Sequence, residues 1–315
     1  MTLAMKPFFE RQIRKPLPGA LADDAGLYIA MRELEGLKPT SLYEYHRELD
    51  RLATMFPEKT AADFTVGDIQ TYLARRTMMP DPETGKRLSQ NSRRKVILVL
   101  NSFFRWAVMS GRCPAGNPML TIKPPSFKFR EPTAWTPEEM DRILQAPAKQ
   151  PRDALLLHVL AYCGQRVGAT ARLQWKHVHG LGTRDCVIRF PPSKGDELHT
   201  VPVMKRELHE KIVLMRELTQ PQPEDWLFAS RQGGYLDLNQ ITRIVEHACR
   251  WAQVSKPWTA HQFRRSLITN LLEAGQELTV VSKVVANHKS PQTTMLHYRS
   301  VPGATAKAAF SATPW

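Results

Sequence analysis

The most informative pair of side chains in the sequence is His261 and Arg264. Thr259 can cap a helix that begins there and stops at Gly275, which places both side chains on one face of its first turn. Free backbone N–H groups and the helix dipole favour an anion at this position, so the pair suits a phosphate. Taken alone, an HxxR pair is more often part of an ordinary protein surface than of a site.

Other segments of the second half offer single reactive side chains. Lys194 stands at the tip of a predicted turn over residues 191–197, and Tyr298 follows the last well-defined helical pattern. The sequence has no phosphate-loop motif, no GxGxxG after a strand and no HExxH, so nucleotide and zinc-protease chemistry lacks support. A nucleophile that works without a cofactor remains open.

The composition describes a basic globular protein. Its 315 residues, 42% of them apolar, are enough for two domains with separate cores. The formal net charge of +14, spread over both halves, favours a polyanionic partner, with nucleic acid as the leading candidate. The alternative is a generally basic surface that keeps the protein in solution.

The cysteines and the N-terminus indicate a reducing, cytoplasmic location. The four cysteines are far apart and form no CxxC pair or other metal-ligand spacing, so we expect reduced, mostly buried thiols. The first residues mix charges into a few apolar positions, unlike a signal peptide, and no apolar run approaches the length of a membrane span. We therefore expect a protein of the cytoplasm, associated with the nucleoid and not with a membrane.

An all-helical module is predicted in the first part of the chain. Apolar residues recur there at spacings of three and four. Four helices are expected to begin near Ala25, Thr40, Thr65 and Ser89. The longest, over residues 89–110, ends at Gly111, a typical helix-stop glycine.

The first turns of this longest helix carry Arg93, Arg94 and Lys95. Three cations in a row can lie along a phosphate backbone, or they can form a solvated face. The charge of the whole chain favours the first interpretation, and we predict that all three contact DNA.

A region rich in Pro and Gly separates this module from the rest. Residues 113–118 and 123–132 lack periodicity, and a new helix is expected after Thr136, with Pro137 at its first position and Glu139 completing a capping box. The predicted organisation is an N-terminal extension (1–24), a helical DNA-binding domain (25–118), a linker (119–135) and a second domain (136–315).

The second domain is predicted to be mainly helical with a small antiparallel sheet. We expect one helix to end near Gly164 and another to cover residues 169–175. Two apolar runs, 186–190 and 198–203, read as the strands of a hairpin whose turn holds Lys194. Helices then dominate to the end of the chain.

Three segments together resemble the tyrosine recombinase, or phage integrase, family. Residues 163–175 look like its first arginine box, with Arg166 as the arginine. Residues 259–275 are similar to its second arginine box, and residues 284–298 resemble its closing box, with His288 and Tyr298. Lys194 matches the family's hairpin lysine, and the helix over 89–110 with its flanks looks more loosely like the core-binding domain.

The resemblance implies a fold, a reaction and a set of site residues. The fold would be a C-shaped clamp of a helical core-binding domain and an α+β catalytic domain. The reaction would be site-specific recombination through a 3′-phosphotyrosyl link, without metal, ATP or other cofactor. The implied catalytic residues are Arg166, Lys194, His261, Arg264, His288 and the nucleophile Tyr298, with Arg265 and Lys289 as further DNA contacts.

The resemblance also implies partners and leaves alternatives. The partners would be duplex DNA with an inverted-repeat site and further copies of the chain, as a tetramer in the synaptic complex. The biological role would be integration or excision of a mobile element, or resolution of DNA multimers; the short stretch before the helical module favours a simple resolvase or small integrase. A DNA-binding accessory protein that has lost catalysis and a relaxing enzyme of the type IB topoisomerase kind are the alternatives.

The sequence departs from the family pattern at four positions. Ala169 stands where many relatives have an acidic residue, and Asn287 replaces the usual glycine before the histidine. Arg265 follows the second arginine where His is common, and one extra residue separates His288 from the tyrosine. His297 therefore competes for the nucleophile position, and we prefer Tyr298 because a tyrosyl phosphodiester retains the energy of the broken DNA bond better than a labile phosphohistidine.

Overall fold

The computed structural model describes residues 12–13, 15–80, 85–127, 133–192 and 198–285. The chain forms two compact units that divide between Arg130 and Glu131, a point inside the predicted linker. Each unit has its own hydrophobic core. No helix in the described ranges combines the length and apolar character needed to cross a membrane.

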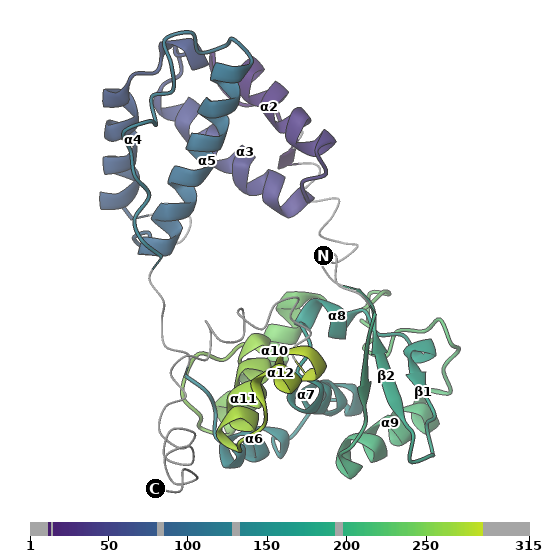
Figure 1. Ribbon diagram of the computed structural model, residues 1–315. Coiled ribbons are helices and arrows are strands. Elements are labelled where there is room, and N and C mark those ends of the chain that lie inside the picture. Colours follow the sequence, from purple (N-terminus) through teal and green to yellow (C-terminus); the bar gives the residue numbers. More distant parts are fainter. Residues whose placement is uncertain (1–11, 14, 81–84, 128–132, 193–197, 286–315) are drawn as a thin grey trace, which may run out of the picture. The chain divides into compact units, whose positions relative to one another are not determined.

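The first unit is helical, in agreement with the sequence. Its long helices, shown in Figure 1, are α2 (Ala22–Leu34), α3 (Pro39–Met55), α4 (Val66–Met78) and α5 (Gln90–Met109). Ser89 and Thr65 are N-cap residues whose hydroxyl oxygens accept hydrogen bonds from the backbone of the first turn, which explains why these helices begin where they do. Aromatic rings of α2 and α5 fill the space between these two helices, with Tyr28 and Phe103 packed edge to face at 5.3 Å between centroids.

The first unit extends beyond the limits predicted for it. Leu17 and Leu21, assigned by the sequence to an N-terminal extension, are buried in its core, and α2 begins three residues earlier than expected. Met119 at the other end is also buried there, whereas Trp135 is buried in the core of the second unit. The predicted linker is therefore too wide at both ends, because Pro and Gly content marks irregular backbone and does not reveal which side chains are buried.

The second unit contains helices of very different lengths around a small sheet. Its helices are α6 (Pro137–Leu144), α7 (Pro151–Cys163), α8 (Val167–Ala171), α9 (Arg206–Thr219), α10 (Leu238–Trp251), α11 (Ala260–Glu273) and the short α12 (Leu278–Val280), which continues into a π-helical turn, η3 (Val281–Val285). The capping box predicted for α6 is present, with Thr136 and Glu139 each accepting from the other's backbone N–H.

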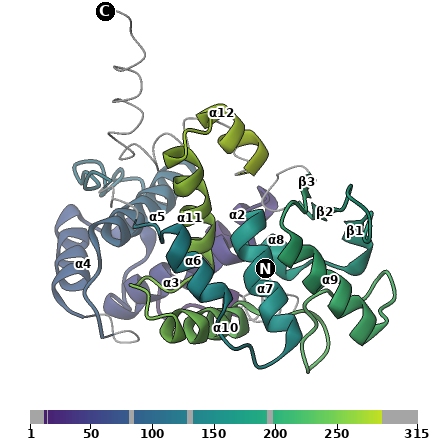
Figure 2. The same cartoon turned by 90° about the horizontal axis from the view of Figure 1, so that it is seen from below.

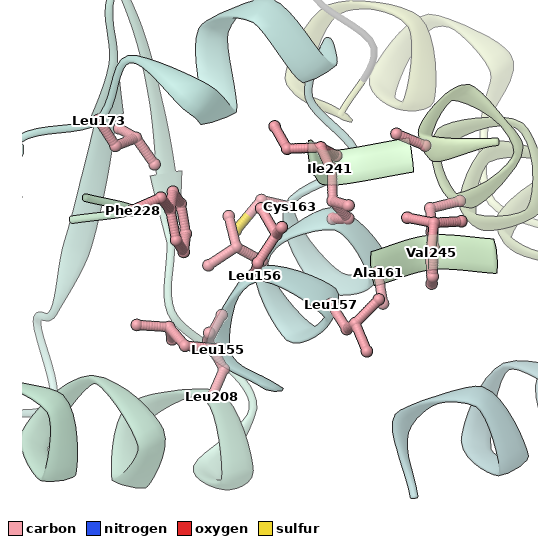
Figure 3. Packing of buried hydrophobic residues seen from close by; sticks show 14 of the residues in the cluster. Leu155, Leu156, Leu157, Ala161, Cys163, Leu173, Leu208, Phe228, Ile241 and Val245 are labelled. Carbon is pink, nitrogen blue, oxygen red and sulfur yellow. The ribbon is translucent and has the colours of Figure 1, made fainter. Parts of the chain in front are cut away.

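Helix α7 is the centre of the second unit's core. Nine of its thirteen residues are buried, so it contacts apolar neighbours on nearly every side. Figure 3 shows Leu155 directed toward Leu208 of α9 and Ala161 directed toward Val245 of α10, with Cys163 between the two groups. In Figures 1 and 2, α7 and α8 lie between the α10–α11 pair and the sheet. The helix that leads into the first arginine box is thus the most firmly packed one in this unit.

The predicted hairpin is confirmed, and a third strand joins it. Strands β2 (Val187–Phe190) and β3 (His199–Pro202) pair antiparallel, with Phe190 opposite His199 as the last pair before the turn. Strand β1 (Val178–His179), which the sequence analysis missed, pairs with the other edge of β2. Two residues are too few to show an alternating pattern, so no sequence signal marks this strand.

The helix predicted over residues 169–175 is wrong in its second half. Helix α8 ends at Ala171, and the backbone then becomes extended at Gln174. Hydrogen bonds run from Leu227 N to Leu173 O and from Trp175 N to Asp225 O. Pairing with a segment about fifty residues later satisfies the backbone groups that a longer helix would have satisfied.

Candidate active site

Helix α11 carries the HxxR pair at its first turn. Thr259 occupies the N-cap position, as predicted, but its side chain makes no capping hydrogen bond; its backbone carbonyl accepts one from Gln262 N at 2.9 Å. The two members of the pair differ in burial: His261 is exposed, whereas Arg264 is 3% exposed. The sequence predicted their shared turn and did not predict this difference.

Arg264 is bound to the first arginine box. Its Nη1 donates a hydrogen bond of 2.8 Å to the carbonyl oxygen of Gly164, which is the C-cap residue of α7. Arg166 follows two residues later at the N-cap of α8. The buried arginine of the second box therefore holds the turn that presents the arginine of the first box.

Gly164 is suited to this junction for two reasons. Its φ of +59° lies in the left-handed region, where side chains other than glycine's are strained. A Cβ atom at this position would also lie 2.7 Å from Leu267 Cδ2 of α11 and 3.4 Å from Val285 Cγ1 of η3. Helix α11 and the turn η3 thus pack directly on the backbone that connects α7 to α8.

Gln165 connects the same turn to the start of the closing box. This buried side chain donates from Nε2 to Cys163 O at 3.0 Å and to Val285 O at 2.9 Å. Val285 precedes His288 by three residues in the sequence. The sequence analysis missed Gln165; its position next to Arg166 was the one available signal, and its distant partner cannot be read from local pattern.

Arg166 is half-buried and begins α8 with an extended backbone. Its carbonyl oxygen accepts hydrogen bonds from Ala169 N at 2.9 Å and Thr170 N at 3.1 Å, so the helix starts directly after the arginine. Ala169, in the place of the family's acidic residue, is buried. The turn, and not a side chain from position 169, sets the backbone of Arg166.

The Cys163 thiol beside this turn is unreactive at neutral pH. Cys163 is buried, and this burial, together with a smaller effect of nearby Cys186, raises its pKa to about 12. A thiol with so high a pKa is protonated at neutral pH and is a poor nucleophile. All four cysteines are free and buried, which confirms the prediction of reduced thiols for the chain.

The back of α11 binds the segment that enters the second unit. Trp135 N donates to Ser266 Oγ at 2.8 Å, and Asn270 Nδ2 donates to Trp135 O at 3.1 Å. Gln262 Nε2 donates to Thr133 O. The indole of Trp135 also packs edge to face on Phe263 at 5.1 Å. Helix α11 is therefore fixed on two sides, by the entering segment and by the Gly164 turn.

Four predicted site residues lie outside the described residues: Lys194, His288, Lys289 and Tyr298. Lys194 belongs to residues 193–197, which join β2 to β3, and the other three follow η3. The structure thus brings together Arg166 and the pair His261–Arg264 through the Gly164 turn. The catalytic roles of all six residues stay predictions.

Only some of the side chains predicted to contact DNA in the first unit are exposed to solvent. Arg93 and Lys95 are exposed at the start of α5. Arg94 is half-buried, and its Nη1 donates to Pro125 O at 2.9 Å, so this guanidinium is engaged by the protein itself. Arg265 of the second unit is also half-buried. A contiguous run of cations predicts charge but does not predict which side of the helix each one occupies.

A basic groove that the sequence analysis missed lies beside Lys95 in the first unit. Its volume is about 880 Å³, and α3, α4 and α5 contribute to its walls. Its lining contains the cations Arg47, Arg76, Lys86, Arg87 and Lys95 and the carboxylates Glu44 and Glu48, of which Glu44 pairs with Arg47 and Glu48 with Arg76. They come from segments far apart in the sequence, and this is why no local motif reveals the groove.

The comparison with protein families gives a match over the second unit. The family model described as "Phage integrase family" matches residues 134–302, more than half of the chain. Among curated proteins, a tyrosine recombinase of Pseudothermotoga lettingae is 27% identical over 215 residues, covering 68% of this chain and 72% of that protein. The tyrosine recombinase XerD of Pseudomonas putida is 28% identical over 210 residues, covering 63% of this chain and 67% of that protein.

Solved structures show the same fold at low sequence identity. A lambda integrase dimer bound to a COC′ core site has a TM-score of 0.71 at 18% identity, covering 95% of this chain and 83% of that one. The XerH site-specific recombinase in a post-cleavage complex with a palindromic difH substrate has a TM-score of 0.69 at 16% identity, covering 98% and 94%. With the family match and the joined arginine boxes, these findings identify the chain as a member of the phage integrase family of tyrosine recombinases, a site-specific DNA recombinase.

Proposed function

We propose that this recombinase cuts and rejoins duplex DNA through a 3′-phosphotyrosyl link on Tyr298. The observation that carries the proposal is the hydrogen bond from Arg264 to Gly164 O, which ties the two arginine boxes into one assembly around Arg166. Two arginines from distant segments, held on one backbone turn beside an exposed histidine, fit the binding of a single phosphodiester.

The arginines serve the phosphate and the other residues move protons. Arg166 and Arg264 bind the non-bridging oxygens and stabilise the negative charge that grows as the tyrosine oxygen attacks. A tyrosine has a pKa of about 10, so His261 accepts its proton during the attack, and His288 hydrogen-bonds the phosphate. Lys194 protonates the departing 5′ oxygen, which leaves a free 5′ hydroxyl.

The second half of the reaction is strand exchange. The 5′ hydroxyl of a partner duplex attacks the phosphotyrosyl link, which restores the DNA backbone and releases the tyrosine without ATP. Two such rounds at an inverted-repeat site require a tetramer of this chain, and one solved relative is a lambda integrase tetramer bound to a Holliday junction. The chemistry serves both integration or excision of a mobile element and resolution of DNA multimers.

The two units divide the work in this proposal. The first unit is the core-binding domain, and its basic groove with Lys95 follows the phosphate backbone. The second unit is the catalytic domain, because it contains the Gly164 turn and α11. Phosphate contacts in the first unit position the duplex, so their loss weakens binding to all sequences alike.

A suicide substrate tests the proposal. In a duplex nicked next to the cleavage position, attack releases a short fragment that carries the new 5′ hydroxyl. Because this fragment dissociates, the DNA cannot be rejoined and the covalent protein–DNA adduct accumulates. The adduct is quantified on a denaturing gel. The wild-type chain and a Tyr162→Phe control should form the adduct, and Tyr298→Phe should not. An adduct in Tyr298→Phe contradicts the nucleophile assignment, and relaxation of supercoils without strand exchange favours a topoisomerase-like activity instead.

A further inference from the structure

The side chain of Arg172 joins the helix after Arg166 to the base of the hairpin. Arg172 is the half-buried C-cap residue of α8. Its Nε donates to Gly168 O within the same helix at 2.9 Å, and its Nη2 donates to Pro192 O at 3.1 Å. One guanidinium therefore connects the helix that begins at Arg166 with the chain that has just left β2.

The geometry of this bridge depends on arginine. The guanidinium is planar and presents separate N–H groups in a fixed fork, so two nitrogens reach two carbonyl oxygens at once. The bond to Gly168 O sets the plane of the fork, because it closes the C-terminal end of α8 in the way basic side chains commonly do. A lysine has a single nitrogen on a flexible stem and can hold only one end firmly.

Pro192 is close in sequence to the hairpin lysine. It follows β2 by two residues and precedes Lys194 by two. Two residues of chain span at most about 7 Å, so an anchor on the carbonyl of Pro192 limits the positions that the next backbone atoms can reach. The proline ring also fixes one backbone angle at the anchor point.

On the basis of the proposed function, we infer that Arg172 is a positioning residue for Lys194. It ties the start of the hairpin turn to α8. Lys194, which protonates the leaving oxygen, and Arg166, which binds the phosphate, are therefore positioned relative to the same helix. Arg172 acts through Lys194 and does not itself touch the DNA. Removal of its side chain should then impair the departure of the 5′ oxygen more than the binding of the phosphate.

The step that reports this role is the cleavage of the bond from phosphorus to the 5′ oxygen. The tyrosine oxygen forms a bond to phosphorus, its proton passes to His261, the bond to the 5′ oxygen breaks, and a proton from Lys194 Nζ completes the new hydroxyl. Alkoxides are poor leaving groups because the pKa of their conjugate acids lies far above neutral pH. A thiol has a pKa of about 8.5, so a sulfur at the 5′ position leaves without protonation.

The test uses a duplex with a bridging 5′-phosphorothiolate at the cleaved position. Rates of single-turnover adduct formation are compared on the oxygen and sulfur substrates. On the oxygen substrate, Arg172→Ala should slow cleavage on the order of 10–100-fold, part of the factor that general acid catalysis contributes. On the sulfur substrate, its rate should return to within about 3-fold of wild type, because no proton is needed. Arg172→Lys should fall between wild type and Arg172→Ala.

A double variant separates positioning from a direct role. If Arg172 acts through Lys194, the pair Arg172→Ala with Lys194→Ala should cleave the oxygen substrate no more slowly than Lys194→Ala alone. Arg206→Ala is the matched control, since this guanidinium on α9 is 91% exposed and contacts Glu210 of its own helix; its rates should equal those of wild type. Thermal unfolding checks that each variant is folded.

Two results overturn the inference while leaving the proposed function intact. Equal slowing of folded Arg172→Ala on both substrates would mean that Arg172 supports phosphate binding, and multiplied effects in the double variant would mean that it acts independently of Lys194. The proposed function fails differently: wild type then forms no tyrosyl adduct on either substrate, or the sulfur substrate gives no rescue of Lys194→Ala.

Discussion

Arg264 Nη1 lies 2.8 Å from the carbonyl oxygen of Gly164, a residue one hundred positions earlier in the chain. Hydrogen bonds from a charged group to a backbone carbonyl contribute about 1.5–3 kcal/mol, more than neutral ones. Arg264 is 3% exposed, so water cannot readily replace the carbonyl as a partner. The contact therefore orients the guanidinium that we propose to be catalytic and fixes the turn before Arg166 at the same time.

Replacing Gly164 with alanine should disturb both arginines. The left-handed backbone costs a residue with a side chain about 1–2 kcal/mol, and the new Cβ would lie 2.7 Å from Leu267 Cδ2. We expect Gly164→Ala to lower the free energy of unfolding by at least that amount and to slow adduct formation beyond the loss of folded protein. Urea unfolding and single-turnover cleavage measure the two effects.

Gly168→Ala is the matched control for this variant. Gly168 lies within α8, and a Cβ there would meet no atom of the described residues within 4 Å outside its chain neighbours and its own helix backbone. Alanine is the better helix former by about 1 kcal/mol, so this change should leave stability equal or slightly higher and cleavage unchanged. Equal effects of the two substitutions would show that the Gly164 turn has no special role.

Gln165→Leu should uncouple the Gly164 turn from η3. The change keeps the volume of the side chain but removes the hydrogen bonds from Nε2 to the buried carbonyl oxygen of Cys163 and to the carbonyl oxygen of Val285. An unsatisfied buried acceptor costs about 1–3 kcal/mol, and the segment that leads to His288 loses its anchor. Adduct formation should fall while DNA affinity, measured by fluorescence anisotropy, stays within about 2-fold of wild type.

The exposed residue Gln276 provides the control for Gln165. Gln276→Leu makes the same chemical change on the surface after α11 and should leave adduct formation unaltered. If Gln165→Leu cleaved DNA at the wild-type rate, the anchoring role of its amide would be wrong.

Some features of the fold and of this site could be predicted from the sequence, and others could not. The HxxR segment, the Thr136 capping box and the hairpin were predictable, because each depends on residues within fifteen positions of one another. The same local pattern misplaced the end of α8, since Leu173 and Trp175 pair with residues about fifty positions away. Long-range pairing overrides helical periodicity, and one sequence does not reveal it.

The burial of individual side chains was the second feature that could not be predicted from the sequence. Arg94 and Arg93 are neighbours of one type, yet one binds Pro125 O and the other is exposed. Gln165 had no predicted role, although it holds two carbonyl oxygens of the site. These differences arise from which segment packs against each side chain, and that depends on the whole fold.

The first unit depends on a buried charge network around Glu48. Its carboxylate accepts a hydrogen bond from Tyr72 Oη at 2.6 Å and lies 3.5 Å from Arg76 and 3.7 Å from Arg51. Burial, and next the charge of Glu48, raise the pKa of Tyr72 well above its usual value, so the tyrosine stays a donor. Glu48→Ala should lower the free energy of unfolding by about 1–3 kcal/mol, because it leaves the buried Tyr72 hydroxyl without the carboxylate acceptor and the half-buried Arg51 and Arg76 without this counter-charge.

Circular dichroism during urea unfolding would measure the loss at Glu48. The exposed residue Glu58 gives the comparison, and Glu58→Ala should change stability by less than about 0.5 kcal/mol. A loss below about 1 kcal/mol for Glu48→Ala would mean that water replaces the network.

Alkaline pH should destabilise the second unit through Cys163. Its pKa is raised by burial to about 12 in the folded chain, against about 8.5 for a free thiol. A raised pKa means that the thiol's contribution to stability is present below about pH 8.5 and is lost as pH rises toward 12. In that window the unfolded thiol releases its proton and the folded one keeps it, so the free energy of unfolding falls by about 1.4 kcal/mol per pH unit.

The difference between wild type and Cys163→Ala isolates this thiol from the tyrosines and lysines that titrate in the same range. Unfolding is measured from pH 7 to 11, and the wild-type curve should be the steeper one above about pH 9. Parallel curves would show that the Cys163 thiol ionises in the folded protein as readily as in the unfolded one.

The nucleophile is identified by the residue of the trapped peptide that carries the nucleotide. The adduct from a nicked suicide substrate is digested with protease and nuclease, and fragmentation mass spectrometry locates the phosphorylated residue among His297 and Tyr298. We predict an acid-stable 3′-phosphotyrosyl nucleotide on Tyr298. An acid-labile link on His297, or an adduct at any other residue, would contradict it.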